Sequence, residues 1–232
     1  MSDSLTVIVF AREPEPGSAK TRLIPKLGAA NTAALADAFV RDAMAKATAL
    51  KTSLVIAGSA PKGVAHSKYF QRLARRYKAI LVEQGGGTLG ERMSRTIQPF
   101  AQKSAILIGT DTPSLPLVLL RQSRAALRRK PIVIGPSLDG GYYLVGIRGE
   151  MPDIFRGVRW GGSRVLEQTV KRLRREKLKF ALGPAWYDID RWNDLLVLCV
   201  HLERLTRRSA DPCPATRRLL ARLGMFQSRR LK

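Results

Sequence analysis

Short runs of almost continuous apolar residues, separated by stretches with helical periodicity, most constrain the fold of this chain. We expect strands over residues 5–10, 53–57, 79–82, 105–108, 132–134 and 142–147. Because these runs are apolar at nearly every position, both faces of the sheet are expected to be covered. Strands that alternate with helices of this length predict an α/β domain with a mostly parallel sheet.

The helices expected between these strands cover residues 32–50, 90–101, 117–129, 163–175 and 191–204. Asn31 is expected to cap the first of them, and Pro116 to stand in the first turn of 117–129. In such a domain, ligands bind beyond the carboxyl ends of the strands. The loops that follow the strands are therefore the places to look for functional residues.

The length of 232 residues suffices for one sizeable core, since a chain of this size buries roughly 70 to 75% of its unfolded surface. We expect one domain over residues 1–200. From His201 to Lys232, nine Lys and Arg stand against two acids. This segment predicts a basic helical tail over 201–232, with a helix, a turn and a second short helix, packed on the domain or trailing it.

The charge balance indicates anionic partners. Lys and Arg number 41 against 18 Asp and Glu, which gives a net charge of +23 and a field that attracts phosphate, nucleotide, nucleic acid or acidic lipid. Aromatic residues are only 6% of the chain, and the arginines of 117–129 have no aromatic residues between them. We therefore expect salt-sensitive adhesion to nucleic acid but no specific recognition of it.

The sparse cysteines and histidines exclude several kinds of site. Cys199 and Cys213 lack the spacing of a zinc knuckle or a disulfide framework, which indicates a reducing compartment. His66 and His201 have no other His or Cys at ligand spacing, so the chemistry falls to carboxylates, Lys and Arg. The run 5–10 is too short to span a bilayer and does not resemble a signal peptide, so we expect a cytoplasmic protein without a membrane span.

The loop after the first strand is basic and contains a glycine. Gly17 permits close approach of the backbone to a ligand, and Lys20 and Arg22 follow it, so the loop is suited to phosphate. It is not a Walker A motif, because Ala19 and Pro14 occupy the positions where that motif requires glycine. The alternative is a solvated basic surface loop.

A glycine-rich turn follows the third strand. Residues 85–90 satisfy G-x-G-x-x-G, with Asp111 about twenty residues further on. We do not favour a dinucleotide site here, because any glycine-rich turn at a strand end matches so short a pattern, and because that reading assigns no role to the acidic residues further along the chain.

Acidic residues follow two of the expected strands and end a further short extended segment. Asp111 comes directly after 105–108, Asp139 precedes two glycines, and Asp188 and Asp190 stand at i and i+2 before a helix, which would place them on one face of an extended segment. Each has a simpler alternative as a turn or cap residue. Together, facing a basic loop, they suit Mg²⁺ or Mn²⁺ bound through carboxylates and substrate phosphates, with Asp111, Asp188 and Asp190 as ligands.

The joint pattern of these motifs resembles a family of GT-A-like nucleotide-diphospho-sugar transferases. In bacterial genomes its members are usually called uncharacterised glycosyltransferases or radical SAM-associated transferases, and they are distantly similar to the guanylyltransferases of 2-phospho-lactate and molybdopterin. The motifs are PxPGxxKTRL (14–23), LGxRM (89–93), GTDxPxL (109–115), GPxxDGGYYL (135–144), Trp160 with the small residues after it, and DxD (188–190).

The resemblance implies a three-layer GT-A-like fold and a nucleotide bound by two segments. The binding residues it implies are Gly17, Lys20, Thr21, Arg22, Leu89, Gly90 and Arg92. Lys20 and Arg22 would neutralise phosphates, the metal on Asp111 and Asp190 would bridge them, and Asp139 would hold the acceptor or act as general base. The chain departs from the family at Thr88, where an acid is usual, and after the DxD at 191–194.

The predicted function is therefore that of a metal-dependent transferase with a nucleotide donor. Nucleotidyl transfer from a nucleoside triphosphate and glycosyl transfer from a sugar nucleotide need the same phosphate site, and the KTRL segment favours the first through its resemblance to the guanylyltransferases. The acceptor is not identified. The alternative is a non-catalytic nucleotide-binding protein or a basic nucleic-acid-binding protein.

Overall fold

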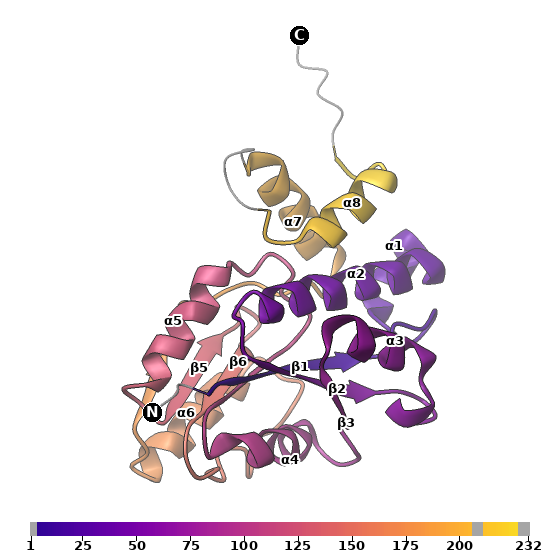
Figure 1. Cartoon of the computed structure of the whole chain (residues 1–232). Coiled ribbons are helices and arrows are strands. Elements are labelled where there is room, and N and C mark those ends of the chain that lie inside the picture. Colours follow the sequence, from indigo (N-terminus) through magenta and orange to yellow (C-terminus); the bar gives the residue numbers. More distant parts are fainter. Residues whose placement is uncertain (1–3, 206–210, 227–232) are drawn as a thin grey trace.

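The computed structural model describes residues 4–205 and 211–226, and a seven-stranded sheet in the order β3-β2-β1-β4-β6-β5-β7 organises this part of the chain (Figure 1). Only β6 runs antiparallel to its neighbours, β4 and β5. The strands are β1 (Thr6–Arg12), β2 (Ser53–Ser59), β3 (Ile80–Glu83), β4 (Ala105–Ile108), β5 (Ile132–Pro136), β6 (Tyr142–Ile147) and β7 (Phe180–Leu182).

Helices cover both faces of this sheet, and others lie outside these layers. The helices of the described residues are α1 (Ile24–Leu27), α2 (Ala29–Thr48), α3 (Lys68–Tyr77), α4 (Leu89–Ala101), α5 (Leu117–Leu127), α6 (Val165–Arg175), α7 (Trp192–Arg204) and α8 (Pro214–Arg222), with short 3-10 turns at Thr21–Leu23 and Val64–His66. Alternate residues of β1 face opposite layers: Val7 and Val9 pack with α2, α3 and α5, whereas Ile8 packs with α4 and α6. The expected three-layer α/β fold with a mostly parallel sheet is confirmed.

A third apolar cluster joins the C-terminal helices to the rest of the protein. Leu35 and Phe39 of α2 pack against Leu195 and Leu198 of α7 and Leu219 of α8, and Figure 1 shows both helices on the outer side of α2. The expected boundary between residues 200 and 201 falls inside α7, and the division of the chain into two parts stays a prediction. Residues 206–210 and 227–232 of the expected tail lie outside the described residues.

The sequence located most elements closely. The bounds of β4 and β6 agree with the expected runs, and the other predicted strands begin or end within two residues of their observed bounds. The expected cap at Asn31 is wrong: α2 begins at Ala29 after Gly28, whose φ of 77° belongs to glycine, and the Asn31 amide donates to the Leu27 carbonyl inside the helix. The helix α3 and the strand β7 were not predicted.

Two further observations bear on the ends of the chain. Among the described residues, no helix is long and apolar enough to cross a membrane. The start of α8 is held by Asp42 of α2, whose buried carboxylate accepts hydrogen bonds from the backbone N–H groups of Ala215 and Thr216, both at 2.9 Å, and from the Thr216 hydroxyl at 2.6 Å. Asp42 therefore caps a helix that lies more than 170 residues away in the sequence.

Replacing Asp42 with Ala should lower the free energy of unfolding by about 3 kcal/mol, because three buried donors lose their acceptor. Urea unfolding measures the change. The matched control is Glu167→Ala, which removes an exposed carboxylate paired with Arg164 and should have a much smaller effect. Equal effects of the two variants would contradict the assigned role of Asp42.

Candidate functional site

Two adjoining cavities lie at the edge of the sheet where the parallel strands end. The first, of about 570 Å³, is called here the β1-side cavity, and the second, of about 780 Å³, the α7-side cavity. Both are lined by Asp111, Asp190 and Arg22, so they meet at these residues. Such a crevice beyond the carboxyl ends of the strands is where α/β sheets bind ligands.

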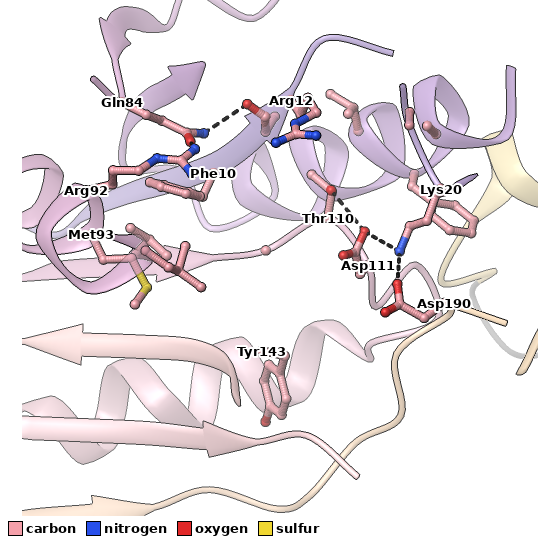
Figure 2. Close-up of a pocket in the computed structure, with 18 of the residues that line it drawn as sticks. Phe10, Arg12, Lys20, Gln84, Arg92, Met93, Thr110, Asp111, Tyr143 and Asp190 are labelled. Atoms are coloured by element: carbon pink, nitrogen blue, oxygen red, sulfur yellow. Dashed lines mark hydrogen bonds and ion pairs between the residues drawn. The ribbon is translucent and has the colours of Figure 1, made fainter. Parts of the chain in front are cut away.

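Lys20 occupies the junction between the cavities. Its ammonium lies 2.8 Å from Asp111 Oδ1 and 2.7 Å from Asp190 Oδ1, with 9% of the side chain exposed (Figure 2). Arg22 Nη1 lies 3.2 Å from the other oxygen of Asp190. The structure thus places Lys20, Arg22, Asp111 and Asp190 next to one another, while their roles stay a prediction.

The charges at this junction shift the pKa values of the groups. Burial by itself lowers the pKa of Lys20, but Asp111 and Asp190 outweigh it and the pKa is raised. Burial would likewise raise the pKa of Asp190, yet Lys20 and Arg22 hold it below its ordinary value. Both groups are therefore charged near neutral pH.

Backbone contacts explain why these residues meet. The N–H of Ile189 donates to the carbonyl of Asp111 at 2.8 Å, which fastens the segment before α7 to the loop after β4. Asp194 accepts the N–H groups of Asp190 and Arg191 and so caps α7. The Asp190 backbone is therefore fixed on both sides.

The loop after β4 is also held from its other end. The ammonium of Lys46, on α2, donates to the carbonyl of Pro113, and the indole N–H of Trp186 donates to the Ser114 hydroxyl at 3.1 Å. Neither contact could be predicted from the sequence, because the partners lie far apart along the chain.

The carboxylates at the junction suit a divalent cation. One carboxylate oxygen of Asp111 and one of Asp190 both contact the Lys20 ammonium. The two carboxylates therefore already bind a cationic group between them. One or two carboxylates with substrate phosphates are a typical Mg²⁺ ligand set. Within the described part of the chain, no group of three or more His, Cys, Asp or Glu is arranged to hold a metal.

Asp188, the third expected ligand, has different neighbours. It lines the α7-side cavity with Asp190, but its Oδ1 accepts a hydrogen bond from the Ser137 hydroxyl at 3.1 Å. Burial, followed by the nearby charge of Asp139, raises the pKa of Asp188. Asp139 accepts the N–H of Gly141 at 2.8 Å and lines the same cavity. Asp188 and Asp139 therefore form an acidic pair on the side away from Lys20.

The far wall of the β1-side cavity contains residues that sequence reasoning missed. Gln84, directly after β3, donates to the carbonyls of Ala11 at 2.9 Å and Ala57 at 2.7 Å, and its oxygen accepts from Arg92 (Figure 2). The Arg92 guanidinium lies 5.4 Å from the centre of the Phe10 ring. Arg12, the last residue of β1, also lines the cavity. Gln84 and Arg12 were the residues missed, and their positions at the ends of β3 and β1 were the signal that could have indicated them.

The expected nucleotide-binding residues divide into two groups. Lys20, Thr21, Arg22, Leu89 and Arg92 line the β1-side cavity. The other two expected residues, Gly17 and Gly90, line neither cavity.

Gly90 has a packing role instead. A Cβ at this position would lie 2.6 Å from the Trp160 ring and 2.7 Å from Phe155, so only glycine fits. Trp160 packs edge-on against Phe155 and Tyr142 and also lines the α7-side cavity. The turn 85–90 serves mainly to start α4, where Thr88 and Glu91 form a capping box.

The histidines lie away from the junction. His66 lies in an exposed turn. His201 lies on α7, and its Nδ1 is 2.6 Å from the hydroxyl oxygen of Tyr187. Tyr187 lines the α7-side cavity, whereas neither histidine lines either cavity.

The fold matches that of solved structures in the nucleotide-diphospho-sugar transferase class. A family model described as "Uncharacterized protein conserved in bacteria (DUF2064)" matches residues 40–162, more than half of the chain, and the chain belongs to this family. No curated protein matches the sequence.

Solved structures support the assignment of the fold. A protein from Desulfovibrio desulfuricans G20, provisionally described as a nucleotide-diphospho-sugar transferase, is 30% identical with a TM-score of 0.83, over 97% of this chain and 99% of that one. A cytidylyltransferase from Leptospira borgpetersenii is 14% identical, with a TM-score of 0.56 over 99% of both chains. Glucosyl-3-phosphoglycerate synthase from Mycobacterium tuberculosis is 10% identical, with a TM-score of 0.50 over 97% of this chain and 81% of that one. The likeness of the last two shows the fold alone.

Lys20→Met should raise the affinity for Mn²⁺ in the absence of nucleotide by at least about tenfold, because it removes a positive charge from between the two carboxylates. Titration calorimetry measures this affinity. Lys26→Met, which removes the same charge from the exposed α1, is the control. Weaker Mn²⁺ binding by Lys20→Met than by Lys26→Met would show that the two carboxylates do not bind the ion.

Proposed function

We propose that this chain is a metal-dependent transferase with a nucleotide donor, and that nucleotidyl transfer from a nucleoside triphosphate is its reaction. The observation that carries the proposal is the convergence of Asp111 and Asp190 on one cationic point where two cavities meet. One cavity can then take the donor and the other the acceptor, with the phosphates at the junction.

The charge of the β1-side cavity supports a triphosphate donor. Four cationic side chains line it, from Arg12, Lys20, Arg22 and Arg92. Burial is the largest cause that lowers the pKa of Arg92. Repulsion from the charges of Arg12 and Arg95 lowers this pKa further. An anion between these groups would relieve the repulsion. A triphosphate carries more negative charge than the diphosphate of a sugar nucleotide, so its charge matches that of the β1-side cavity better.

Each site residue has a role in this proposal. Asp111 and Asp190, with Asp188 beside them, would hold Mg²⁺ or Mn²⁺, which when bound neutralises phosphate charge and stabilises the leaving group. Arg22 can bind a phosphate through two parallel hydrogen bonds, and Lys20 can shift from the carboxylates to the phosphates. Asp139, which lines the α7-side cavity, would hold the acceptor hydroxyl and take its proton.

Glycosyl transfer from a sugar nucleotide is the second candidate. It is favoured by the provisional description of the 30% identical Desulfovibrio relative. The two reactions differ in the product they release. Nucleotidyl transfer breaks the α–β phosphate bond and frees pyrophosphate, whereas glycosyl transfer breaks the anomeric carbon–oxygen bond and frees a nucleoside diphosphate.

We place this activity in the cytoplasm. Nucleotide donors are made there, and the buried free thiols of Cys199 and Cys213 suit a reducing compartment. A link to radical SAM proteins also stays a proposal, supported by the motif pattern alone.

A thermal-unfolding panel of nucleoside triphosphates and sugar nucleotides, each with and without Mg²⁺ or Mn²⁺, tests the proposal. A ligand at one hundred times its dissociation constant adds about 2.7 kcal/mol of stability. We expect a triphosphate with metal to stabilise the wild type most. Stabilisation by sugar nucleotides alone would favour glycosyl transfer, and stabilisation by neither would overturn the proposal.

In the same panel, Asp111→Asn should lose the metal-dependent part of the stabilisation, because an amide binds a divalent cation far more weakly than a carboxylate does. Asp153→Asn, at an exposed acid paired with Arg172, is the control and should behave as the wild type. Unchanged metal-dependent binding by Asp111→Asn would remove Asp111 from the site.

Arg22→Lys should weaken triphosphate binding about tenfold, since the ammonium cannot make two parallel hydrogen bonds to one phosphate. Arg129→Lys, beyond the end of α5 and away from both cavities, should leave the affinity unchanged. Titration calorimetry with the triphosphate identified in the panel measures both. If the two substitutions have equal effects, the first loop is only a solvated basic surface.

A further inference from the structure

A third cavity lies at the opposite edge of the sheet from the candidate site. Its volume is about 690 Å³, which is within the range of small-ligand sites, and we call it the amino-edge cavity. Leu5 and Ser104 line it directly before β1 and β4 begin, and Arg148 lines it directly after the antiparallel β6 ends. Among the described residues, it shares no lining residue with the β1-side cavity or the α7-side cavity, so the proposed reaction does not use it.

Four cationic side chains line the amino-edge cavity, and they come from three separate segments. Lys103 lies just after α4, Arg124 lies on α5 with Arg128 at its C-terminal end, and Arg148 follows β6. None of the described residues that line this cavity is acidic. The fold therefore gathers in one cavity cations that stand far apart in the sequence.

The acids that adjoin the lining residues in the sequence do not cancel this charge. Glu150 follows the lining residue Gly149, and Asp3, which is outside the described residues, precedes the lining residue Ser4. Even with both acids counted, four cations stand against two acids. The surplus of positive charge at this cavity is therefore local, and it comes from side chains that the structure describes.

The backbone that carries these cations is held by the sheet. The N–H of Arg148 donates to the carbonyl of Pro131 at 2.8 Å, and the carbonyl of Ser104, next to Lys103, accepts the N–H of Thr6 at 2.9 Å. Binding groups on a fixed backbone lose less conformational entropy on binding than groups on a mobile segment do. The amino-edge cavity is therefore arranged for a ligand before one binds.

We propose that the amino-edge cavity binds a small anion with two or more phosphate groups. A guanidinium can bind one phosphate through two parallel hydrogen bonds, so four cations exceed what a single phosphate requires. The side chains of Leu5 and Leu127, each 2% exposed, also line the cavity, and apolar walls strengthen the attraction between its cations and an anion. Inorganic oligophosphates and nucleoside diphosphates share this chemistry. The proposal does not depend on the proposed function, because the two sites have no residue in common.

Titration calorimetry with the full chain, at physiological ionic strength and without metal, tests this proposal. The probes are inorganic triphosphate, orthophosphate and adenosine diphosphate. The cavity variant combines Lys103→Met and Arg148→Met, both at exposed positions. The matched control combines Lys171→Met and Arg75→Met, which also removes one exposed lysine and one exposed arginine, from helices outside the three cavities. Thermal unfolding verifies that the variants are folded.

A further variant keeps this test separate from the proposed function. It combines Arg12→Met and Arg22→Met, which removes two cations from the β1-side cavity and leaves the amino-edge cavity intact. We expect the wild type and the control to bind inorganic triphosphate at two sites. The cavity variant should bind it at one of these sites at least about tenfold more weakly, and the Arg12 and Arg22 variant should retain that site.

The possible outcomes are distinct. Equal binding by the cavity variant and the control would show adhesion through net charge alone and overturn the proposal, as would orthophosphate that binds this site as tightly as triphosphate. Weaker binding by the Arg12 and Arg22 variant alone would overturn this proposal and leave the proposed function intact. Weaker binding by the cavity variant alone would support this proposal and count against the proposed donor site. Tighter binding of adenosine diphosphate than of inorganic triphosphate at this site would support it and identify the ligand as a nucleotide.

Discussion

The buried ammonium of Lys20 connects three loops that lie far apart in the sequence. Without it, Asp111 and Asp190 would face each other as like charges at the junction of the two cavities. This position of Lys20 requires a left-handed backbone conformation with φ of 51°, which destabilises the folded state by on the order of 1 kcal/mol. A conformation of this kind persists only where the surroundings fix it, and here two ion pairs do so. A group that binds these carboxylates more strongly must displace the lysine toward whatever anion is nearby.

Much of the site could be predicted from the sequence, because it rests on a topological rule and not on particular contacts. Apolar runs located the strands, and the carboxyl ends of parallel strands meet at one edge, so the residues after β1 and β4 had to be neighbours. The i, i+2 spacing of Asp188 and Asp190 did bring both to the α7-side cavity, with Ile189 buried between them. Their partners differ, however, since Asp190 binds Lys20 and Asp188 binds Ser137. Spacing indicates a face but does not indicate which side chains lie across from it.

The rest depends on tertiary packing that no local pattern reveals. Gln84 has a role because two backbone carbonyls and one guanidinium surround it, and its own neighbours in the sequence carry no sign of this. Gly90 shows another case, in which a glycine of a motif associated with ligand contact also makes room for Trp160, which the sequence does not reveal. The Asn31 cap failed for a related reason: a good capping residue stood three positions inside a helix that a glycine had already begun. Such errors concern the ends of elements and the reason for a residue, and the two elements that were missed, α3 and β7, left the order of the predicted ones unchanged.

The two cavities differ in charge, and this difference gives the site a direction. Five of the 18 acids in this strongly basic chain line the α7-side cavity: Asp111, Asp139, Asp188, Asp190 and Asp194. The β1-side cavity has four cationic side chains, of which Arg22 also lines its neighbour, and the acids that line it are the two at the junction, Asp111 and Asp190. In a phosphoryl or glycosyl transfer, negative charge develops on the leaving group while the attacking hydroxyl gives up a proton. In the proposed reaction, cations on the donor side would stabilise that charge, and carboxylates on the acceptor side would accept that proton. The reverse placement of donor and acceptor would put both developing charges beside groups of the wrong sign.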